Sequence, residues 1–184
     1  MLNPESVDFC IEPLDAHHDR ESFCCGQASL DRYLQTTATQ DKKRNIAIPY
    51  VIYDRERQTI IGYYTLSMSG INLEDLPPSI ANKLPKYPIV GVTLIGRLAV
   101  AQDYKGCGWG KLLILDALYR SLSVSQTMAS FAVVGDAIDD DAVKFYQRFE
   151  FQAFPDHPNK LFRTMANISK TFGALDQTEL PKHP

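Results

Sequence analysis

The feature that most constrains the fold is a glycine-rich turn between an apolar run and a helical run. Val92–Val100 is apolar except for Arg97, which predicts a buried central strand. The stretch "YKGCGWGKLL", Tyr104 to Leu113, then places three glycines within five residues, before a helical run from about Gly108 to Ser123. This order exposes backbone N–H groups at a helix N-terminus, where an anion such as phosphate binds favourably.

Spacing decides between the known phosphate-binding turns. A Walker A loop needs Gly-x4-Gly-Lys-Ser/Thr, but Lys105 and Leu112 stand where the first glycine and the hydroxyl residue should be. A dinucleotide fingerprint needs Gly-x-Gly-x-x-Gly, whereas Gly106, Gly108 and Gly110 are spaced two and two. A third pattern fits: Arg/Gln-x-x-Gly-x-Gly/Ala after a strand, with Lys105, Gly108 and Gly110 at its three positions.

The flanking segments predict a mixed α/β sheet in a single domain. Residues 28–44 have apolar positions at helical spacing, and residues 49–68 form two β-rich runs around a polar turn, an antiparallel hairpin. Residues 72–91 hold four prolines and predict a long connection with a short helix at Ser79–Leu84. A strand within residues 128–137, a helix over 139–149 and a closing strand pair at 151–154 and 160–165 follow.

Composition excludes several classes of protein. The 184 residues are 45% hydrophobic and 22% charged, which is ordinary for one globular domain with a core. No apolar run is long enough to span a membrane, and the N-terminus lacks a secretory signal, so we expect a cytoplasmic location. Cys10, Cys24, Cys25 and Cys107 fit no zinc pattern and predict reduced thiols. A net charge of −3 argues against a general nucleic-acid binder.

The third pattern and a second motif together resemble the GNAT acyltransferase superfamily. Members often carry Asn-x-x-Ala-x-x-x-Tyr-x-x-x-Gly-Phe on the last helix, and Ala142, Tyr146 and Phe151 match it here. Lys105, Asp139 and Glu150 depart from the family residues Arg/Gln, Asn and Gly. The resemblance covers about residues 20–166. It implies the α/β (α+β) GNAT fold, a mixed, mostly antiparallel sheet of about six to seven strands flanked by helices, over residues 1–170, with a polar tail at 171–184.

Four segments narrow the resemblance to the GNAT toxins of bacterial toxin–antitoxin modules. They are "FCCGQASLDRYL", "IIGYYTLS", "LIGRLAV" and "KFYQRFEF". Such toxins acetylate the free α-amino group of aminoacyl-tRNA and so inhibit translation. The resemblance therefore implies an N-acetyltransferase with acetyl-CoA as co-substrate and no metal, a ribbon–helix–helix antitoxin as partner, and a homodimer.

The resemblance also implies a role for each site residue. Tyr146 would donate a proton to the departing CoA sulfur, and Arg97 would help to hold the tRNA acceptor end. The residues expected at the cofactor are Leu98, Ala99, Val100, Lys105, Gly106, Cys107, Gly108, Trp109, Gly110, Lys111, Asp139 and Ala142. Lys42, Lys43 and Arg44 are further candidates for phosphate contacts, although cations there also suit the end of a helix.

Two other functions remain open at this point. The chain could be a GNAT acetyltransferase for a small-molecule or protein amine, or a non-catalytic CoA-binding module. No general base stands out, but a free α-amino group titrates near 7.7–8.0 and needs little help. His17, His18, His157 and His183 lie in polar segments and are expected to be exposed.

Overall fold

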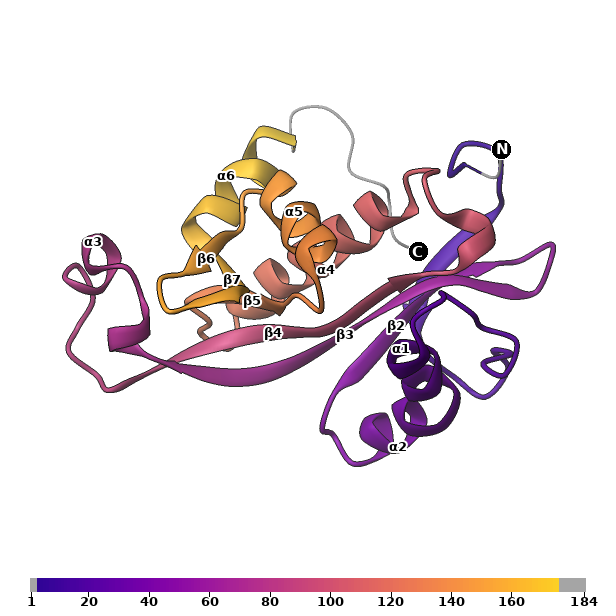
Figure 1. Cartoon of the computed structure of the whole chain (residues 1–184), viewed down its shortest axis with the longest axis horizontal. Coiled ribbons are helices and arrows are strands. Elements are labelled where there is room, and N and C mark those ends of the chain that lie inside the picture. The colour runs from indigo at the N-terminus through magenta and orange to yellow at the C-terminus, as the bar shows by residue number, and fades with distance from the viewer. Residues whose placement is uncertain (1–2, 176–184) are drawn as a thin grey trace. The chain divides into compact units, whose positions relative to one another are not determined.

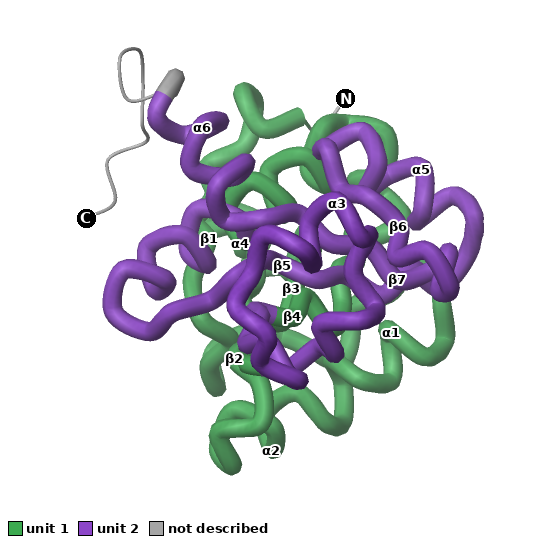
Figure 2. Tube along the Cα trace, turned by 90° about the vertical axis from the view of Figure 1, so that its left-hand side faces the viewer, with its two compact units in different colours: residues 1–68, 94–117 green, residues 69–93, 118–184 purple. Residues whose placement is uncertain are grey.

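The computed structural model describes residues 3–175, whose strands form one seven-stranded sheet (Figure 1). The strand order is β1-β2-β3-β4-β5-β7-β6, which confirms the predicted sheet architecture. The chain divides into two compact units, drawn in separate colours in Figure 2: residues 1–68 with 94–117, and residues 69–93 with 118–184. Each unit is described by itself below. No helix among residues 3–175 is both long enough and apolar enough to cross a membrane.

The first unit holds the N-terminal helices and the predicted hairpin. Its elements are β1 (Phe9–Pro13), α1 (Ala28–Arg32), the π-helical turn η1 (Tyr33–Thr37), α2 (Ala38–Lys43), β2 (Ile48–Asp54) and the first part of β3 (Thr59–Asn72). It also holds the end of β4 (Ile89–Val100), η3 (Gln102–Tyr104) and the start of α4 (Trp109–Ser125). β1, β2 and β3 pair antiparallel in sequence order, with a bulge at Ile52/Tyr53. The hairpin was predicted, whereas β1 was not.

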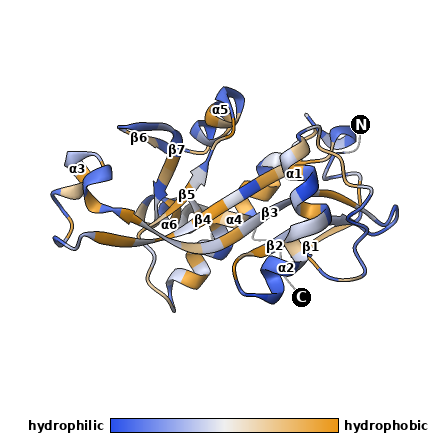
Figure 3. Cartoon of the chain, turned by 60° about the horizontal axis from the view of Figure 1, so that its bottom comes forward, coloured by the Kyte–Doolittle hydropathy of each residue, from blue (hydrophilic) through white to orange (hydrophobic). Residues whose placement is uncertain are grey.

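The helical face predicted for residues 28–44 is the buried face. Leu30, Tyr33, Leu34 and Ala38 all lie in the core cluster with Val51 and Tyr63 of the adjacent strands. Figure 1 shows α1 and α2 beside β2, and Figure 3 shows α2 as largely hydrophilic on its remaining surface. The helix widens into a π turn at Tyr33–Thr37, a feature that occurs often at functional sites.

The second unit holds the C-terminal strands and three helices. Its elements are η2 (Leu73–Asp75), α3 (Pro78–Ala81), β5 (Ala132–Asp136), α5 (Asp140–Arg148), β6 (Gln152–Phe154), β7 (His157–Thr164) and α6 (Met165–Leu175). β7 pairs antiparallel with both β5 and β6. The strand and helix predicted after residue 128 are confirmed. α6 was not predicted, and it includes residues 171–175, which the sequence assigned to a tail; the rest of that tail lies outside the described residues.

The buried face of α4 and the burial of His18 differ from expectation. In α4 the fully buried apolar residues are Trp109, Leu113, Ile114, Ala117 and Leu118. The apolar residues expected to form the helix face were Leu112, Leu115, Leu118, Tyr119 and Leu122, so the core-facing side is shifted from that expectation. The helix has apolar residues around much of its circumference, so periodicity alone does not indicate which side faces the core. His18 is only 3% exposed, so its predicted exposure was wrong, whereas His17 and His157 are exposed as expected.

Glu150 ends α5 in a left-handed conformation that usually favours glycine. Its φ is +61°, at the position where the motif that the sequence resembles has glycine. The side chain compensates, because its carboxylate accepts a hydrogen bond from the guanidinium of Arg163, which is 3% exposed. Thr171 of α6 contacts the same guanidinium nitrogen. The buried guanidinium of Arg163 requires a partner, and Glu150 supplies it. The ion pair therefore offsets the strain of the left-handed backbone at Glu150.

We therefore expect Glu150→Gly to destabilise the protein. Relief of the left-handed backbone is worth about 1–2 kcal/mol, but the lost bond to a charged group costs about 1.5–3 kcal/mol and leaves Arg163 under-paired. The melting temperature should fall by a few degrees. Gln58→Gly is the matched control, since Gln58 has φ +55° and is exposed; it should raise the melting temperature. A higher melting temperature for both variants would show that the ion pair contributes nothing.

Candidate active site

The glycine turn has the backbone that its sequence suggested. Gly106 and Gly108 have φ of +75° and +94°, values that L side chains rarely adopt. A Cβ atom added at Gly106 would meet nothing within 4 Å, and one at Gly108 would meet only Pro4, at 3.8 Å. The glycines are thus required by the backbone and not by packing. The space above them is open, which fits a pyrophosphate lying against the bare backbone at the N-terminus of α4.

The side chains around the turn divide into buried supports and exposed groups. Trp109 is fully buried and packs edge-on against Phe9, with ring centroids 5.1 Å apart, and against Tyr104. Its side chain therefore anchors the turn in the core, and only its backbone remains a candidate for the cofactor. Lys105 and Lys111 are exposed, and Cys107 is half-buried. Gly110 and Lys111 lie in the first turn of α4, where N–H groups lack acceptors within the helix.

The end of β4 carries Leu98, Ala99 and Val100, the residues expected to pair with the pantetheine arm. β3 approaches this segment closely at Gly62, where an added Cβ would lie 2.8 Å from the carbonyl oxygen of Ala99. The N–H of Ala101 donates to the carbonyl of Ile61, 2.8 Å away. One edge of the β4 end is therefore held by β3 through contacts that only a glycine at position 62 permits.

Arg97 is half-buried and stacks on an aromatic ring. Its guanidinium carbon lies 3.6 Å from the ring centroid of Tyr33, in the π turn. Tyr33 in turn donates its hydroxyl proton to Asp41, at 3.0 Å, and burial raises the pKa of Tyr33 to about 12. Within residues 3–175 the guanidinium forms no ion pair and donates no hydrogen bond. Stacking uses the face of the guanidinium and leaves the N–H groups at its edge for a ligand.

The three cations at the end of α2 have different surroundings. Lys42 donates from its ammonium group to the carbonyl of Leu14, which accounts for its position structurally. Lys43 and Arg44 are exposed, and the part of the chain that the structure describes offers their side chains no hydrogen-bond partner. Lys43 and Arg44 are the more accessible candidates for phosphate contacts.

Tyr146 is buried in the second unit against a bare stretch of strand. It is 4% exposed and its ring packs on Phe145 and Phe151. A Cβ added at Gly135 of β5 would lie 2.7 Å from the phenol ring and 3.1 Å from the hydroxyl oxygen, so only glycine permits this contact. Burial, and then the charge of Asp136, raise the pKa of Tyr146 above its usual value. The hydroxyl forms no hydrogen bond to any described residue, so it remains a protonated donor.

Asp139 and Ala142 start the helix that carries Tyr146. The Asp139 carboxylate accepts a hydrogen bond from the N–H of Ala142, at 2.8 Å, and is the N-cap of α5. Asp and Asn cap helices about equally well, which explains why Asp can replace the family Asn here. Figure 3 shows both hydrophilic and hydrophobic residues on α5.

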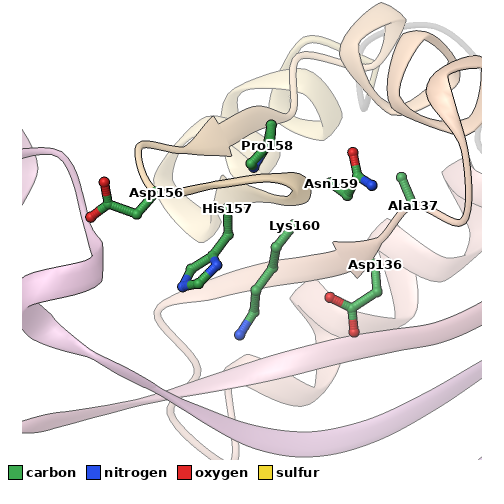
Figure 4. A pocket seen from close by; sticks show the side chains of 7 residues that line it. All are labelled: Asp136, Ala137, Asp156, His157, Pro158, Asn159 and Lys160. Carbon is green, nitrogen blue, oxygen red and sulfur yellow. The ribbon is translucent and has the colours of Figure 1, made fainter.

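A pocket that the sequence analysis missed lies between the end of β5 and the β6–β7 hairpin (Figure 4). Its volume is about 450 Å³, within the usual range for ligand sites. Seven residues line it: Asp136, Ala137, Asp156, His157, Pro158, Asn159 and Lys160. No local sequence pattern indicates this pocket, because Asp136 and Lys160 become neighbours only through the pairing of β5 with β7. The pocket is therefore charged, with both signs present.

Glu12, His17 and His18 are the residues with metal-ligand geometry among those described. The backbone N–H of Asp15 donates to Nδ1 of His18 at 2.9 Å, and Nε2 of His18 lies 3.0 Å from Glu12. Burial lowers the pKa of His18, which favours the neutral ring. A neutral imidazole has one proton, so accepting at Nδ1 places that proton on Nε2, which then has no lone pair for a metal. The cluster is better suited to hydrogen bonding than to metal binding.

The Gly135 contact generates a prediction about stability. Gly135→Ala should lower the melting temperature, because a methyl group 2.7 Å from the Tyr146 ring forces the ring or the strand to move. Overpacking of this kind costs about 1–3 kcal/mol. Gly173→Ala, where an added Cβ meets nothing within 4 Å, is the control and should leave the melting temperature equal or higher. An unchanged melting temperature for Gly135→Ala would contradict the close packing of Tyr146.

Comparisons with known proteins identify, over most of the chain, the family that the sequence motifs resemble. The acetyltransferase (GNAT) family matches residues 14–151. The probable toxin TacT of Sinorhizobium fredii is 28% identical over 94% of this chain and all of its own length. The tRNA-acetylating toxin of Mycobacterium tuberculosis is 29% identical, over 84% of this chain and 91% of that protein.

Two solved structures extend the likeness to three dimensions. A crystal structure of a tyrosine-to-phenylalanine mutant of KacT superposes with a TM-score of 0.84, at 25% identity, and covers 89% of this chain and 99% of that one. AtaT complexed with acetyl-methionyl-tRNAfMet superposes with a TM-score of 0.82, at 28% identity, over 92% and 99% of the two chains. With its glycine turn and its buried tyrosine, the chain belongs to the acetyltransferase (GNAT) family.

Proposed function

We propose that this protein transfers the acetyl group of acetyl-CoA to the α-amino group of aminoacyl-tRNA and thereby inhibits translation. The observation that carries the proposal is the likeness, over nearly the whole chain, to AtaT in complex with acetyl-methionyl-tRNAfMet. The relative from Mycobacterium tuberculosis is described as a tRNA-acetylating toxin, which agrees with the same acceptor. An acetylated amine cannot attack the next ester bond, so the modified tRNA would be lost to peptide synthesis.

The backbone of residues 105–111 would hold the pyrophosphate of acetyl-CoA. Gly106, Gly108 and Gly110 would supply the turn, and the first N–H groups of α4 would be donors to the phosphates. Lys105, Cys107, Trp109 and Lys111 would contribute mainly backbone, although the two exposed lysines can also add positive charge. Leu98, Ala99 and Val100 would pair with the pantetheine arm through an extended backbone. Related AtaT structures contain acetyl-CoA, which agrees with this cofactor.

Acetyl-CoA, when bound, supplies a thioester whose thiolate can leave. A neutral amine forms the new N–C bond as the C–S bond breaks, and the amine proton passes to water. Tyr146 would give its phenolic proton to the departing sulfur and regain a proton from solvent. Its raised pKa keeps the donor protonated at neutral pH, and its hydroxyl is not engaged with any described residue. Asp139 and Ala142 would act through helix α5, by fixing the start of the helix that carries Tyr146.

The acceptor end of tRNA would be held by cations of the first unit. Arg97 keeps the N–H edge of its guanidinium available while its face rests on Tyr33. Lys43 and Arg44 are exposed at the end of α2 and suit backbone phosphates, while Lys42 is already engaged with Leu14. These groups bring positive charge to a chain whose net charge is −3.

The protein partner would be an antitoxin. Structures of AtaT with the antitoxin AtaR, and of a KacTA–DNA complex, concern related chains. We extend this to a ribbon–helix–helix antitoxin, a homodimeric toxin and a cytoplasmic location, as the family resemblance suggests. Neutralisation of growth inhibition by co-expressed neighbouring protein would support the antitoxin part of this proposal.

Incubation with labelled acetyl-CoA should label charged tRNA and leave uncharged tRNA unlabelled. The reason is that only the charged molecule offers an amine with a pKa near or below 8. The label should be recovered as an N-acetyl amino acid after alkaline hydrolysis of the ester. Labelling of small amines or protein, with none in charged tRNA, would favour a GNAT of another specificity. Acetyl-CoA binding without any transfer would favour a non-catalytic module.

Tyr146→Phe should cut kcat strongly, by about 100-fold or more, because it removes the general acid and little else. Acetyl-CoA affinity, measured by calorimetry, should change by less than about threefold, since the ring still packs on Gly135. Tyr119→Phe is a matched control on α4, where Tyr119 packs its ring against Phe172. Equal turnover in wild type and Tyr146→Phe would refute the role of the phenol.

A further inference from the structure

The carboxylate of Asp136 is exposed in the lining of the pocket and has no partner among the described residues. Asp136 is the last residue of β5, and its side chain projects into the pocket shown in Figure 4. Among residues 3–175 its carboxylate accepts no hydrogen bond and forms no ion pair. The nearest expected partner is Lys160, its neighbour in the β5–β7 register. The ammonium of Lys160 instead lies 5.5 Å from the ring centroid of Phe154.

Asp136 and Tyr146 lie on opposite faces of the C-terminal end of β5. Tyr146 packs against the face of β5 on which a Cβ of Gly135 would lie. Successive residues of a strand point to opposite faces, so the side chain of Asp136 leaves the other face. The phenol of Tyr146 thus lies against one face of the β5 end, at Gly135. The carboxylate of Asp136, the next residue of the strand, leaves the other face. Substrate groups that meet at this strand end would be contacted from both sides.

The charges in the pocket indicate what the carboxylate can bind. Asp136 and Asp156 contribute carboxylates, Lys160 contributes an ammonium group, and His157 contributes an imidazole. Figure 4 shows Asp136, His157 and Lys160 projecting to the same side. A carboxylate without a partner in a concave site suits a cation with several N–H donors, such as a primary ammonium group. Lys160 and His157 beside it suit an anionic group on the same ligand, such as a phosphate.

We propose that Asp136 binds the α-ammonium group of the acceptor and orients its nitrogen toward the thioester, an inference that rests on the proposed function. The aminoacyl end of tRNA carries an ammonium and a nearby phosphate, the two charges that this pocket matches. Asp136 is a substrate-binding group and not a base, because its role here is to accept hydrogen bonds from the nitrogen of the acceptor. The amine loses its proton to water and continues to donate to the carboxylate.

The test is a thermodynamic cycle between Asp136 and the amine of the substrate. The probes are the aminoacyl-tRNA that the wild type acetylates fastest among twenty singly charged tRNAs, and the same tRNA charged with the corresponding 2-hydroxy acid. Dissociation constants are measured without acetyl-CoA for wild type and Asp136→Asn. The variant should bind the aminoacyl-tRNA about tenfold more weakly and the hydroxyacyl-tRNA within about twofold of wild type, since that probe has no ammonium to lose.

The matched control is Asp156→Asn, which removes the same charge from the same pocket wall. Removing a negative charge should by itself strengthen binding to an anionic tRNA, so this variant should bind both probes equally well or slightly better. Asp136→Glu, which keeps the charge, should retain most of the discrimination between the two probes.

Three results would overturn the inference. The first is an equal change of both dissociation constants in Asp136→Asn, with the melting temperature unchanged. The second is discrimination lost in Asp156→Asn but kept in Asp136→Asn. The third is a wild type that acetylates none of the twenty charged tRNAs, and this outcome alone also removes the proposed function.

Discussion

The contact between the ring of Tyr146 and the bare backbone of Gly135 is the constraint on which the second unit depends. An added Cβ at Gly135 would lie 2.7 Å from the ring of Tyr146, so the ring lies directly against the backbone of β5. The backbone of β5 therefore restricts where the phenol can lie. Because Asp136 follows Gly135 directly, the same contact also determines where the carboxylate leaves the strand. The phenol of Tyr146 and the carboxylate of Asp136 are thus both positioned by the contact at Gly135.

The two ends of α5 show how local compensation supports that contact. Asp139 caps the first turn through the N–H of Ala142, and Glu150 closes the helix in a left-handed conformation. Glu150 is then held by the buried guanidinium of Arg163. The two departures from the family pattern on this helix are therefore both structural. One substitutes an equivalent cap, and the other replaces a glycine by an ion pair, so neither alters Tyr146, the proposed general acid.

Sequence reasoning succeeded where the signal was local. The backbone of the glycine turn and the helical face of residues 28–44 both depend on spacing within about a dozen residues. It failed for β1, whose short run mixes Glu12 and Pro13 with apolar residues, and for α6, which follows β7 without an intervening turn. The pocket was missed because Asp136 and Lys160 are far apart in sequence, and only the β5–β7 register brings them together.

The positions of individual charged groups matter more for tRNA binding than the net charge of the chain. A protein with a net charge of −3 cannot attract tRNA through its overall field, so specific groups must act at short range. Arg97 fits this requirement, since stacking on Tyr33 positions its guanidinium without neutralising it. Asp41 accepts a hydrogen bond from the Tyr33 hydroxyl and forms no ion pair with Arg97. A carboxylate at Asp136 would repel phosphates but attract an ammonium, so acidic and basic groups together would favour the charged end of tRNA over its backbone. Under the proposed function, selection of an acceptor that carries both charges would allow a mildly acidic chain to use tRNA as its substrate.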